Sequence, residues 1–335
     1  MINRNAPYNA WIVQEPNGPF QSTELNLPSL APGQVLVRIA ASGLNPLDTK
    51  IRAGQAAHAR QPLPAVLGLD MAGTVVETAS GVTAFHEGDE VYGLVGGVGG
   101  HQGTLAEYIT VNADLLALKP RNLSMRQAAA LPLSTITAWE GLVDRAQVHA
   151  GQTVLIHAGA GGVGLLLTQM AKRIGARVIT TVSTEEKAEL SREAGASDVI
   201  LYTEKEFEPE VKRLTGGKGV DVVYDSVGKT TFEGSLNCLR PRGLVALFGA
   251  SSGPVPPFDL IQLSGKGSLF VTRPTLWHYI GTRAELEWRA GDVLGWAASG
   301  ELKLRTEFLY PLAEAAQAQI DLEARRTTGK ILLEP

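Results

Sequence analysis

The chain has 335 residues, of which 44% are hydrophobic and 19% are charged, and its formal net charge is −4. This length predicts two ordinary domains, each with a well-filled core, and the composition is typical of a globular protein. The weak negative charge leaves no electrostatic footprint for nucleic acid, so we expect no nucleic-acid partner.

The cysteine content and the hydropathy indicate which covalent links, metal sites and cellular compartment to expect. Cys238 is the single cysteine, which excludes an internal disulfide and any zinc site of two or more thiolates. A single cysteine suits a reducing compartment, and we expect the cytoplasm. The first residues, MINRNAPYNAWIV, lack the apolar segment of a signal peptide, and no run of 18 apolar residues predicts a membrane span.

Residues 1–125 are predicted to form a β-rich domain with few helices. Short runs of β-type residues are separated there by glycine and proline. These runs predict strands at residues 35–46, 71–77, 89–95 and 105–111.

From about residue 126 the pattern alternates between strands and helices. Strands are predicted at residues 153–158, 176–182, 199–202, 220–227 and 243–250, and helices at 165–175 and 184–195. This alternation predicts an α/β fold with a parallel sheet and crossover helices over residues 126–265. Residues 266–335 return to mixed structure and end in a strand-like run.

The segment AGAGGVG at residues 158–164 directly follows a predicted buried strand and opens a helix. Gly159, Gly161 and Gly164 give the spacing G-x-G-x-x-G, which in this context indicates a dinucleotide site. The first glycine makes a tight turn, the second lets the backbone approach a pyrophosphate, and the third lets the helix pack on the strand. The alternative is a glycine-rich turn that serves packing only.

The tip of the next predicted strand carries no carboxylate. Sites that prefer NAD place an acidic residue there for the ribose 2′-hydroxyl, whereas a 2′-phosphate needs hydroxyl and cationic partners. Ser183 and Lys187 supply such partners, so we expect NADPH, although Glu185 and Glu186 add negative charge nearby. In the alternative, Ser183 and Glu186 form only a helix capping box.

Six segments in chain order together resemble one family. They are GLNPLDTKIRAG (43–54), LGLDMAGTVV (67–76), GDEVYG (88–93), HAGAGGVG (157–164), VVYDSVG (222–228) and GSLFVTRP (267–274). The chain resembles the quinone oxidoreductases, the ζ-crystallin-like branch of the medium-chain dehydrogenase/reductase superfamily. The resemblance implies a GroES-like catalytic domain and a Rossmann domain with NADPH in the cleft between them. It also implies that the last part of the chain returns to the catalytic domain.

The resemblance gives a meaning to the absence of zinc ligands. Zinc alcohol dehydrogenases of this superfamily place a cysteine near the position of Asn45 and a histidine at that of Leu69. Without a Lewis acid to polarise an alkoxide, alcohol oxidation is disfavoured. We therefore expect metal-free hydride transfer to an acceptor that is already electrophilic, such as a quinone.

The resemblance also implies site residues, one position at a time. The candidate catalytic residues are Asn45, Asp48, Lys50 and Thr137. The candidate cofactor-binding residues are Gly159, Gly161, Gly162, Val163, Gly164, Ser183, Lys187, Tyr202, Phe248, Gly249, Ala250, Ser251, Val271, Thr272, Arg273 and Arg325. Among these, residues 248–251 and 271–273 match strands that line the nicotinamide.

Three of these positions, and Asp225 besides, have simpler alternatives. Tyr202 could be a strand-end aromatic residue in the core, and Arg325 a solvated charge. Asn45 could be a turn residue before a proline, and Asp225 could cap the helix that follows it.

The substrate side departs from the family pattern. Many members carry a tyrosine at the position of Lys50, and that tyrosine faces the substrate. The loop at residues 93–104 is longer and richer in glycine than its family counterpart, and it is expected to shape the substrate mouth. His101 and Gln102 are speculative pocket residues there; a lone histidine is more often structural or solvated than catalytic.

Several functions remain open at this point. Besides quinone reduction, the chain could reduce activated C=C bonds of enones or 2-haloacrylates, or act as a binding protein that uses the NADPH-loaded fold as a scaffold. The front of the chain resembles a zinc-free alcohol-dehydrogenase-like group more closely. Either a recombined chain joined near residues 150–160 or an unusual natural member explains that unevenness. The apolar run at 268–272 predicts a homodimer that covers a sheet edge.

Overall fold

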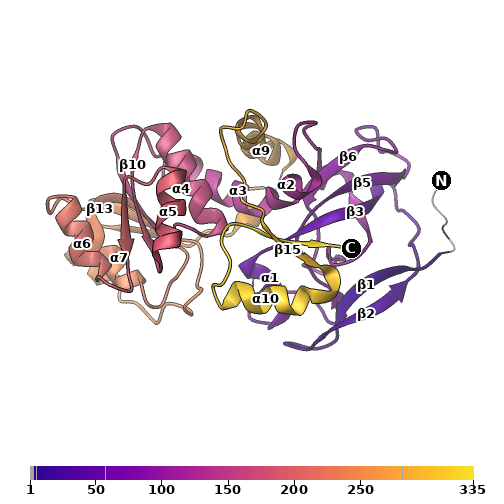
Figure 1. Ribbon diagram of the computed structural model, residues 1–335, viewed down its shortest axis with the longest axis horizontal. Helices are drawn as coiled ribbons and strands as arrows, with labels where there is room; N and C mark the ends of the chain where they lie inside the picture. Colours follow the sequence, from indigo (N-terminus) through magenta and orange to yellow (C-terminus); the bar gives the residue numbers. More distant parts are fainter. Residues whose placement is uncertain (1–3, 5, 57, 281) are drawn as a thin grey trace. The chain divides into compact units, whose positions relative to one another are not determined.

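The computed structural model describes residues 4, 6–56, 58–280 and 282–335 (Figure 1). It divides into two compact units, Met1–Ser134 with Ala290–Pro335, and Thr135–Arg289. Residues 126–134 lie in the first unit because α2 (Met125–Ala130) packs on two of its strands. Residues 266–289 lie in the second unit, since β14 (Phe270–Thr272) joins the parallel sheet there.

The first unit is mainly antiparallel β-structure, in agreement with the predicted β-rich domain. Seven strands form its main sheet in the order β15-β16-β3-β5-β6-β8, with β7 paired to β3, and three more form the sheet β2-β1-β4. The strands are β1 (Tyr8–Val13), β2 (Phe20–Leu25), β3 (Gln34–Leu44), β4 (Ala65–Val66), β5 (Asp70–Thr78), β6 (Glu90–Leu94), β7 (Tyr108–Asn112), β8 (Leu116–Leu118), β15 (Phe308–Pro311) and β16 (Ile331–Glu334). Its helices include α1 (Pro46–Arg52), η1 (Ala113–Leu115), η4 (Leu312–Glu314) and α10 (Ala315–Glu323).

Segments from both ends of the chain meet in the main sheet of this unit. β16 pairs antiparallel with β3, with Ile331 opposite Leu44, and β3 pairs with β5, with Gly43 opposite Asp70. This register brings the residue before β16, the end of β3 and the start of β5 together. Alternating apolar residues of these strands, such as Val35, Val37 and Met71, fill the core beneath.

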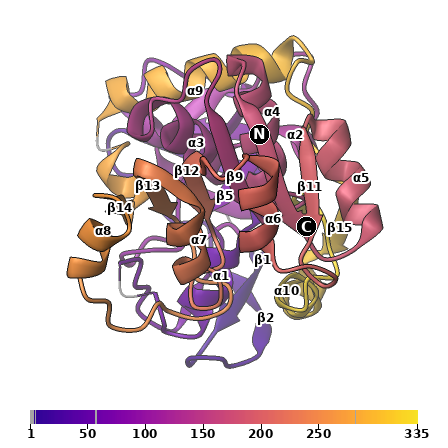
Figure 2. The same ribbon diagram turned by 90° about the vertical axis from the view of Figure 1, so that its left-hand side faces the viewer.

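The second unit contains a six-stranded parallel sheet in the order β11-β10-β9-β12-β13-β14 (Figure 2). Numbered along the chain, this is the 3-2-1-4-5-6 order of a doubly wound dinucleotide-binding fold. The strands are β9 (Thr153–His157), β10 (Arg177–Val182), β11 (Asp198–Leu201), β12 (Val220–Asp225), β13 (Leu239–Leu247) and β14. The connecting segments contain η2 (Glu140–Arg145, a π-helix), α4 (Gly162–Ile174), α5 (Glu185–Ala194), α6 (Phe207–Leu214), α7 (Phe232–Cys238), α8 (Ile261–Gly265) and η3 (Leu276–His278). Two further helices, α3 (Pro132–Trp139) and α9 (Arg283–Ala298), cross the limits of the units.

The helices of the second unit end where the sequence supplies glycine. Gly175 ends α4 and Gly195 ends α5, both with a left-handed backbone that glycine adopts without strain. α4 packs beside α5, and α6 packs beside α7.

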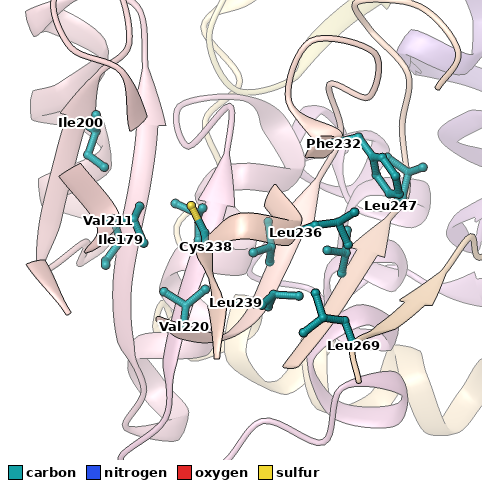
Figure 3. Close-up of a cluster of buried hydrophobic side chains, with 13 residues drawn as sticks. Ile179, Ile200, Val211, Val220, Phe232, Leu236, Cys238, Leu239, Leu247 and Leu269 are labelled. Atoms are coloured by element: carbon teal, nitrogen blue, oxygen red, sulfur yellow. The ribbon is translucent and has the colours of Figure 1, made fainter. Parts of the chain in front are cut away.

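A buried apolar cluster holds α6 and α7 against the sheet (Figure 3). Leu155, Ile179 and Val223 come from the strands, and Val211 and Leu236 come from the two helices. Continuous burial of β-branched and leucine side chains is typical of a parallel sheet that is covered on both faces.

Cys238 belongs to the same cluster. Burial raises the pKa of its thiol to about 12, so Cys238 packs as an apolar residue and is not a reactive thiolate. Within the described ranges, no helix is both long and apolar enough to cross a membrane.

Candidate functional site

The predicted glycine loop lies at the carboxyl end of β9. Gly159 and Gly164 have no room for a side chain: a Cβ atom on Gly159 would lie 2.6 Å from the Ser191 Oγ, and one on Gly164 would lie 2.2 Å from the Ala158 oxygen. The nearest atom to a Cβ on Gly161 would be 3.2 Å away. The first and third glycines therefore serve the tight turn and the close packing of α4, as the motif requires.

The start of α4 suits an anion. Gly161 is the residue before the helix, no side chain caps it, and residues 161–163 are half-buried. The first N–H groups of a helix have no partner within it, and they lie at the positive end of its dipole. The loop therefore fits the pyrophosphate of a dinucleotide.

A buried polar network begins at the residue just before this loop. His157, the last residue of β9, lies 2.9 Å from the Thr181 hydroxyl through Nδ1 and 3.1 Å from the Ser235 hydroxyl through Nε2. The Ser235 hydroxyl donates in turn to Asp225 over 2.9 Å. Burial lowers the pKa of His157, although the charge of Asp225 opposes this shift. The network joins the ends of β9, β10 and β12.

Asp225 binds the turn that leads into α7. Its Oδ1 accepts hydrogen bonds from the backbone N–H groups of Val227 and Gly228 at 2.8 and 2.9 Å. The Thr231 hydroxyl also donates to the carboxylate. The alternative that Asp225 caps the following helix is wrong, because Thr231 is the N-cap of α7 and Asp225 binds the turn before it.

Three predicted cofactor residues lie at or next to the tip of β10. Ser183 follows this strand, Lys187 lies in the first turn of α5, and Tyr202 follows the neighbouring strand β11. The Tyr202 N–H bonds the Val182 oxygen at 3.1 Å. Because Tyr202 is 41% exposed, the alternative that it belongs to the core is wrong.

The capping box suggested for Ser183 and Glu186 is also wrong. Thr184 is the N-cap of α5, and its side chain accepts from the Lys187 N–H. Glu186 bonds Thr184, which lowers the pKa of its carboxyl, and Glu185 pairs with Arg192 at 2.5 Å. The Ser183 side chain is therefore not needed for the helix cap, and both acidic residues are bonded near the start of the helix.

Residues 248–251 and 271–273 lie partly outside the strands expected for them. β13 ends at Leu247, and residues 248–251 form a loop in which the Phe248 N–H bonds the Asp225 oxygen at 2.9 Å. β14 includes Val271 and Thr272 but not Arg273, which donates to the Leu247 oxygen at 3.1 Å. A Cβ on Gly249 would lie 2.4 Å from the Ser226 oxygen, so the turn needs glycine there.

In the first unit, Asn45 and Asp48 form the corner between β3 and α1. The Asn45 N–H donates to Asp48 Oδ2 at 2.7 Å, and the two residues form a capping box at the start of the helix. Both side chains are buried. Asn45 is thus a cap before Pro46, as the simpler sequence interpretation suggested, and its side chain also reaches a second set of partners.

Those partners are Lys330 and Asp70, which the sequence analysis did not single out. The Lys330 ammonium lies 2.5 Å from Asn45 Oδ1, 2.7 Å from Asp70 Oδ2 and 3.3 Å from the Ser134 hydroxyl. Asn45 Nδ2 donates to Asp70 over 3.0 Å, and the Leu133 N–H donates to the other Asp70 oxygen over 3.1 Å. A sequence signal existed only for Asp70, within the motif LGLD.

Asp48 is the titratable group most affected by this environment. Burial raises the pKa of its carboxyl to about 7, the charge of Asp70 adds to the shift, and bonds from Asn45 and the charge of Lys330 oppose it. Asp48 Oδ1 has no hydrogen-bond partner among the described residues. A neutral carboxylic acid tolerates such a site better than a carboxylate.

The remaining predicted residues are Lys50, Arg325 and Thr137, and none of them is among the hydrogen-bond partners given above. Lys50 lies on α1 with its side chain 43% exposed, and it pairs with Glu323 at 3.7 Å. Arg325 is exposed just after α10, with a left-handed backbone. Thr137 is half-buried on α3 in the second unit.

His101 and Gln102 in the loop at residues 93–104 have different surroundings. Gln102 turns inward, donating to the Tyr108 oxygen at 2.7 Å and accepting from Tyr8 at 3.4 Å. His101 is exposed, and its carbonyl accepts from Gln61 at 2.8 Å. Gln102 therefore has a structural role in holding the loop to the sheet, and a pocket role for either residue stays a prediction.

The residues that stand where zinc dehydrogenases carry ligands do not fit a zinc ion. Asn45 offers an amide, Leu69 is a buried hydrocarbon, and the oxygen atoms of Asn45 and Asp70 already bond the Lys330 ammonium. In the described part of the chain, no group of three or more histidine, cysteine, aspartate and glutamate residues is placed to hold a metal. Zinc binds such nitrogen, sulfur and carboxylate ligands.

Family models match both units. Residues 31–121 match the alcohol dehydrogenase GroES-like domain, and residues 162–288 match the zinc-binding dehydrogenase family. The second description names zinc, whereas the residues that the structure describes include no group of ligands placed to hold a metal.

Similar proteins span almost the whole chain. A quinone oxidoreductase of Pseudomonas aeruginosa is 42% identical over 91% of this chain and 92% of its own length. A 2-haloacrylate reductase of a Burkholderia species is 39% identical over 97% of this chain and 98% of its own length. The crystal structure of an Escherichia coli quinone oxidoreductase complexed with NADPH is 39% identical, with a TM-score of 0.91 over 98% of this chain and 99% of that chain.

Proposed function

The chain belongs to the quinone oxidoreductase family of the medium-chain dehydrogenases, and we propose that it transfers a hydride from NADPH to a quinone without a metal ion. The observation that carries the proposal is the carboxyl edge of the parallel sheet in the second unit. There a glycine loop opens α4, and Ser183 and Lys187 lie where a 2′-phosphate needs a hydroxyl and a cation. The relative crystallised with NADPH supports the same cofactor.

NADPH supplies the hydride when it is bound, and the chain's own residues hold and orient it. The pyrophosphate binds the backbone of Gly159, Gly161, Gly162, Val163 and Gly164. Ser183, Lys187, Tyr202 and Arg325 bind the 2′-phosphate and adenosine. The nicotinamide is lined by two segments, with Thr137 beside it. These segments are Phe248, Gly249, Ala250 and Ser251, and Val271, Thr272 and Arg273.

A quinone spreads the incoming negative charge over a conjugated carbonyl, so positioning and exclusion of water are the main contributions required from the protein. Asn45, Asp48 and Lys50 are the first-unit residues proposed to act at the acceptor. Because zinc ligands are missing at Asn45 and Leu69, no Lewis acid is invoked.

Reduction of an activated C=C bond is a second candidate. It is favoured by the Burkholderia 2-haloacrylate reductase, which matches 97% of this chain, and by Lys50, whose ammonium could attract an acidic substrate. In both candidates the chain is an enzyme and not a binding protein that merely carries NADPH.

A panel of acceptors tests the proposal. Loss of NADPH absorbance is followed with 1,4-benzoquinone, a larger ortho-quinone, an enone and 2-chloroacrylate, after subtraction of each uncatalysed rate. Turnover of a quinone is the expected result. Turnover of the alkenes alone would assign the second candidate, and NADPH binding without any turnover would contradict both.

The cofactor assignment has its own test. Lys187→Ala and Ser183→Ala are expected to weaken NADPH binding while leaving NADH binding nearly unchanged, because only NADPH carries the 2′-phosphate. Lys205→Ala is a matched control, since Lys205 lies in the same unit and pairs only weakly with Glu210, at 4.0 Å. Equal losses for NADPH and NADH would contradict the assignment.

We also propose a homodimer formed along β14. This strand ends the six-stranded sheet, and Phe270 on it is 60% exposed, with Leu260 and Ile261 exposed nearby in the sequence. An apolar edge strand is a ready surface for pairing with a second copy. A monomer mass in light scattering at micromolar concentration would contradict the dimer. The buried, free Cys238 supports a reducing compartment, and we propose the cytoplasm.

A further inference from the structure

The Lys330 ammonium is the most deeply buried cation near the candidate catalytic corner. Its side chain is 6% exposed, and that of Asp70 is fully buried. To reach Asp70, Lys330 passes over Gly43, where a Cβ atom would lie 2.8 Å from Lys330 Cε and 3.1 Å from Asp70 Cβ. The Ala129 oxygen would lie closer still, at 2.4 Å, so glycine at this position makes room both for the backbone of α2 and for the charged side chain.

Strand register explains why the two ends of the chain meet here. Ile331 lies opposite Leu44, so Lys330 lies next to Asn45 at the end of β3. Gly43 lies opposite Asp70 on the other side of β3. The Lys330 side chain therefore crosses β3. It binds Asn45, which caps α1, and its counter-ion Asp70.

We infer that Lys330 is a positioning residue: its buried ammonium, shared between Asn45 and Asp70, fixes the Asn45–Asp48 corner and, with Asp70, controls the proton on Asp48. This inference rests on the proposed function only for its catalytic consequence. The effect of the Lys330 and Asp70 charges on Asp48 involves residues of the first unit alone and does not depend on the substrate.

The electrostatic part follows from the arrangement of charges. Asp48 is fully buried, with one unpartnered oxygen, so its charged form is costly. The negative charge of Asp70 raises the pKa of Asp48, and the positive charge of Lys330 lowers it. Removal of one charge and removal of the other must therefore move the pKa of Asp48 in opposite directions.

Other charged groups near Asp48 have partners that face away from it. On α1 itself, Lys50 pairs with Glu323 of α10. Arg52 donates to Gln319 of α10 and to the Gly18 oxygen. Asp70 and Lys330 are the charged groups that act on the Asp48 carboxyl.

The test is a titration of Asp48 in the full-length protein. The protein is labelled with 13C at the aspartate carboxyl carbons, and the Asp48 signal is assigned by its loss in Asp48→Asn. The wild-type midpoint is expected near 7. Lys330→Met is expected to raise the midpoint, and Asp70→Asn is expected to lower it, so the proposal stays testable if only one variant folds.

Lys119→Met is the matched control. The Lys119 side chain is 4% exposed and binds Glu90 at 2.9 Å as well as two backbone oxygens, but it follows β8, away from β16 and β3 in the sheet order. The variant loses an ammonium as deeply buried as that of Lys330, although its partner Glu90 is 52% exposed, and it is expected to leave the Asp48 midpoint unchanged. Equal shifts in Lys119→Met and Lys330→Met would show that general destabilisation, and not the charge, moves the titration.

A kinetic readout completes the test. Lys330→Met is expected to lower kcat for NADPH-dependent turnover at least about tenfold, because small misplacements of catalytic groups have effects of this size. The Kd for NADPH is expected to stay unchanged. Absence of wild-type turnover would contradict the proposed function. The inference about Lys330 and Asp70 would then be tested by the titration of Asp48 alone. No shift, or shifts in one direction for both Lys330→Met and Asp70→Asn, would overturn the inference.

Discussion

Two fully buried carboxylates, one in each unit, are stabilised in different ways. Asp225 in the second unit is stabilised by two backbone N–H groups and two hydroxyl groups, all within ten residues along the chain. Asp70 in the first unit accepts from the Leu133 N–H and the Asn45 amide, and it also pairs with an ammonium that lies 260 residues away in the sequence. Both arrangements are compatible with burial, since hydrogen bonds and an opposite charge each stabilise the charged form.

The difference lies in what happens when a partner is removed. Hydroxyl groups donate or accept and can rotate to suit a changed partner, whereas an ammonium can only donate. The network around Asp225 should therefore adapt to substitution, and the pair of Asp70 and Lys330 should not. The first unit thereby gains electrostatic control of Asp48, and the second gains a local, adaptable support for the glycine loop.

The largest effect is expected for Lys330→Met. Removing one partner of a buried ion pair leaves the other charge uncompensated, which costs about 3–5 kcal/mol of the free energy of unfolding. Urea denaturation measures the loss. The double variant Lys330→Met/Asp70→Asn should regain much of it, because no unpaired charge remains; a double variant less stable than the single one would contradict this account of the pair.

The next effect concerns pH and Asp48. The folded-state pKa is raised from 3.8 to about 7, so between these values the folded state binds more protons than the unfolded state. Stability should fall as the pH rises through this range and level off above about pH 7. Between pH 5 and 7 the change is about 2 kcal/mol, at about 1.36 kcal/mol per pH unit with a smaller slope near the folded pKa.

Asp48→Asn should abolish that pH dependence, because an amide does not ionise. The comparison is made by urea denaturation of both proteins at pH 5, 6, 7 and 8. Parallel profiles for the variant and the wild type would show that Asp48 ionises normally in the folded state.

A smaller loss is expected for Asp225→Asn. The amide oxygen can still accept from the N–H groups of Val227 and Gly228, and the hydroxyls of Thr231 and Ser235 can reorient, so the cost is about 1–3 kcal/mol. Urea denaturation at pH 7 gives the value. A loss as large as that of Lys330→Met would remove the contrast between the two carboxylates.

The smallest effect concerns His157. Burial lowers the pKa of this histidine in the folded state, so its contribution to stability is complete above the unfolded pKa of about 6.5 and decreases as the pH falls below it. The loss at pH 6 is at most about 1 kcal/mol. His157→Gln should remove this acid-side loss in thermal denaturation at pH 6 and 7.5; an identical pH response in both proteins would mean that His157 titrates normally.

The second unit could be predicted closely from the sequence because its signals are local. The strand before Gly159, the glycine spacing and the helix after it lie within about twenty residues, and the order of strands follows from right-handed crossovers. Asp225 reaches partners within the next ten residues, so a local structural role could be expected, although the expected helix cap is instead a bond to the turn before α7. The error at residues 248–251 arose because their apolar character resembles a strand although the backbone turns back to Asp225.

The charge pair of the first unit could not be predicted in the same way. Asn45 and Asp48 were found as motif residues, but nothing near Lys330 in the sequence indicates that it pairs with Asp70. Only the register of β16 on β3 brings them together, and that register depends on long-range pairing of strands. The single cysteine limits the thiolate ligands that the chain offers to zinc, but it could not show that an ammonium binds Asn45 and Asp70.

The most direct test of the proposed chemistry follows a deuterium label. NADPH is prepared with deuterium on one or the other face of C4 of the nicotinamide, and each form is oxidised by the protein with 1,4-benzoquinone. Mass spectrometry then measures the deuterium left in the NADP⁺ product, with the uncatalysed reaction as the control. The expected result is nearly complete loss of deuterium from one form and nearly complete retention in the other, because a bound cofactor presents one face to the acceptor. Hydride transfer on this protein would be contradicted if both forms gave the same mixture of labelled and unlabelled NADP⁺ as the uncatalysed reaction.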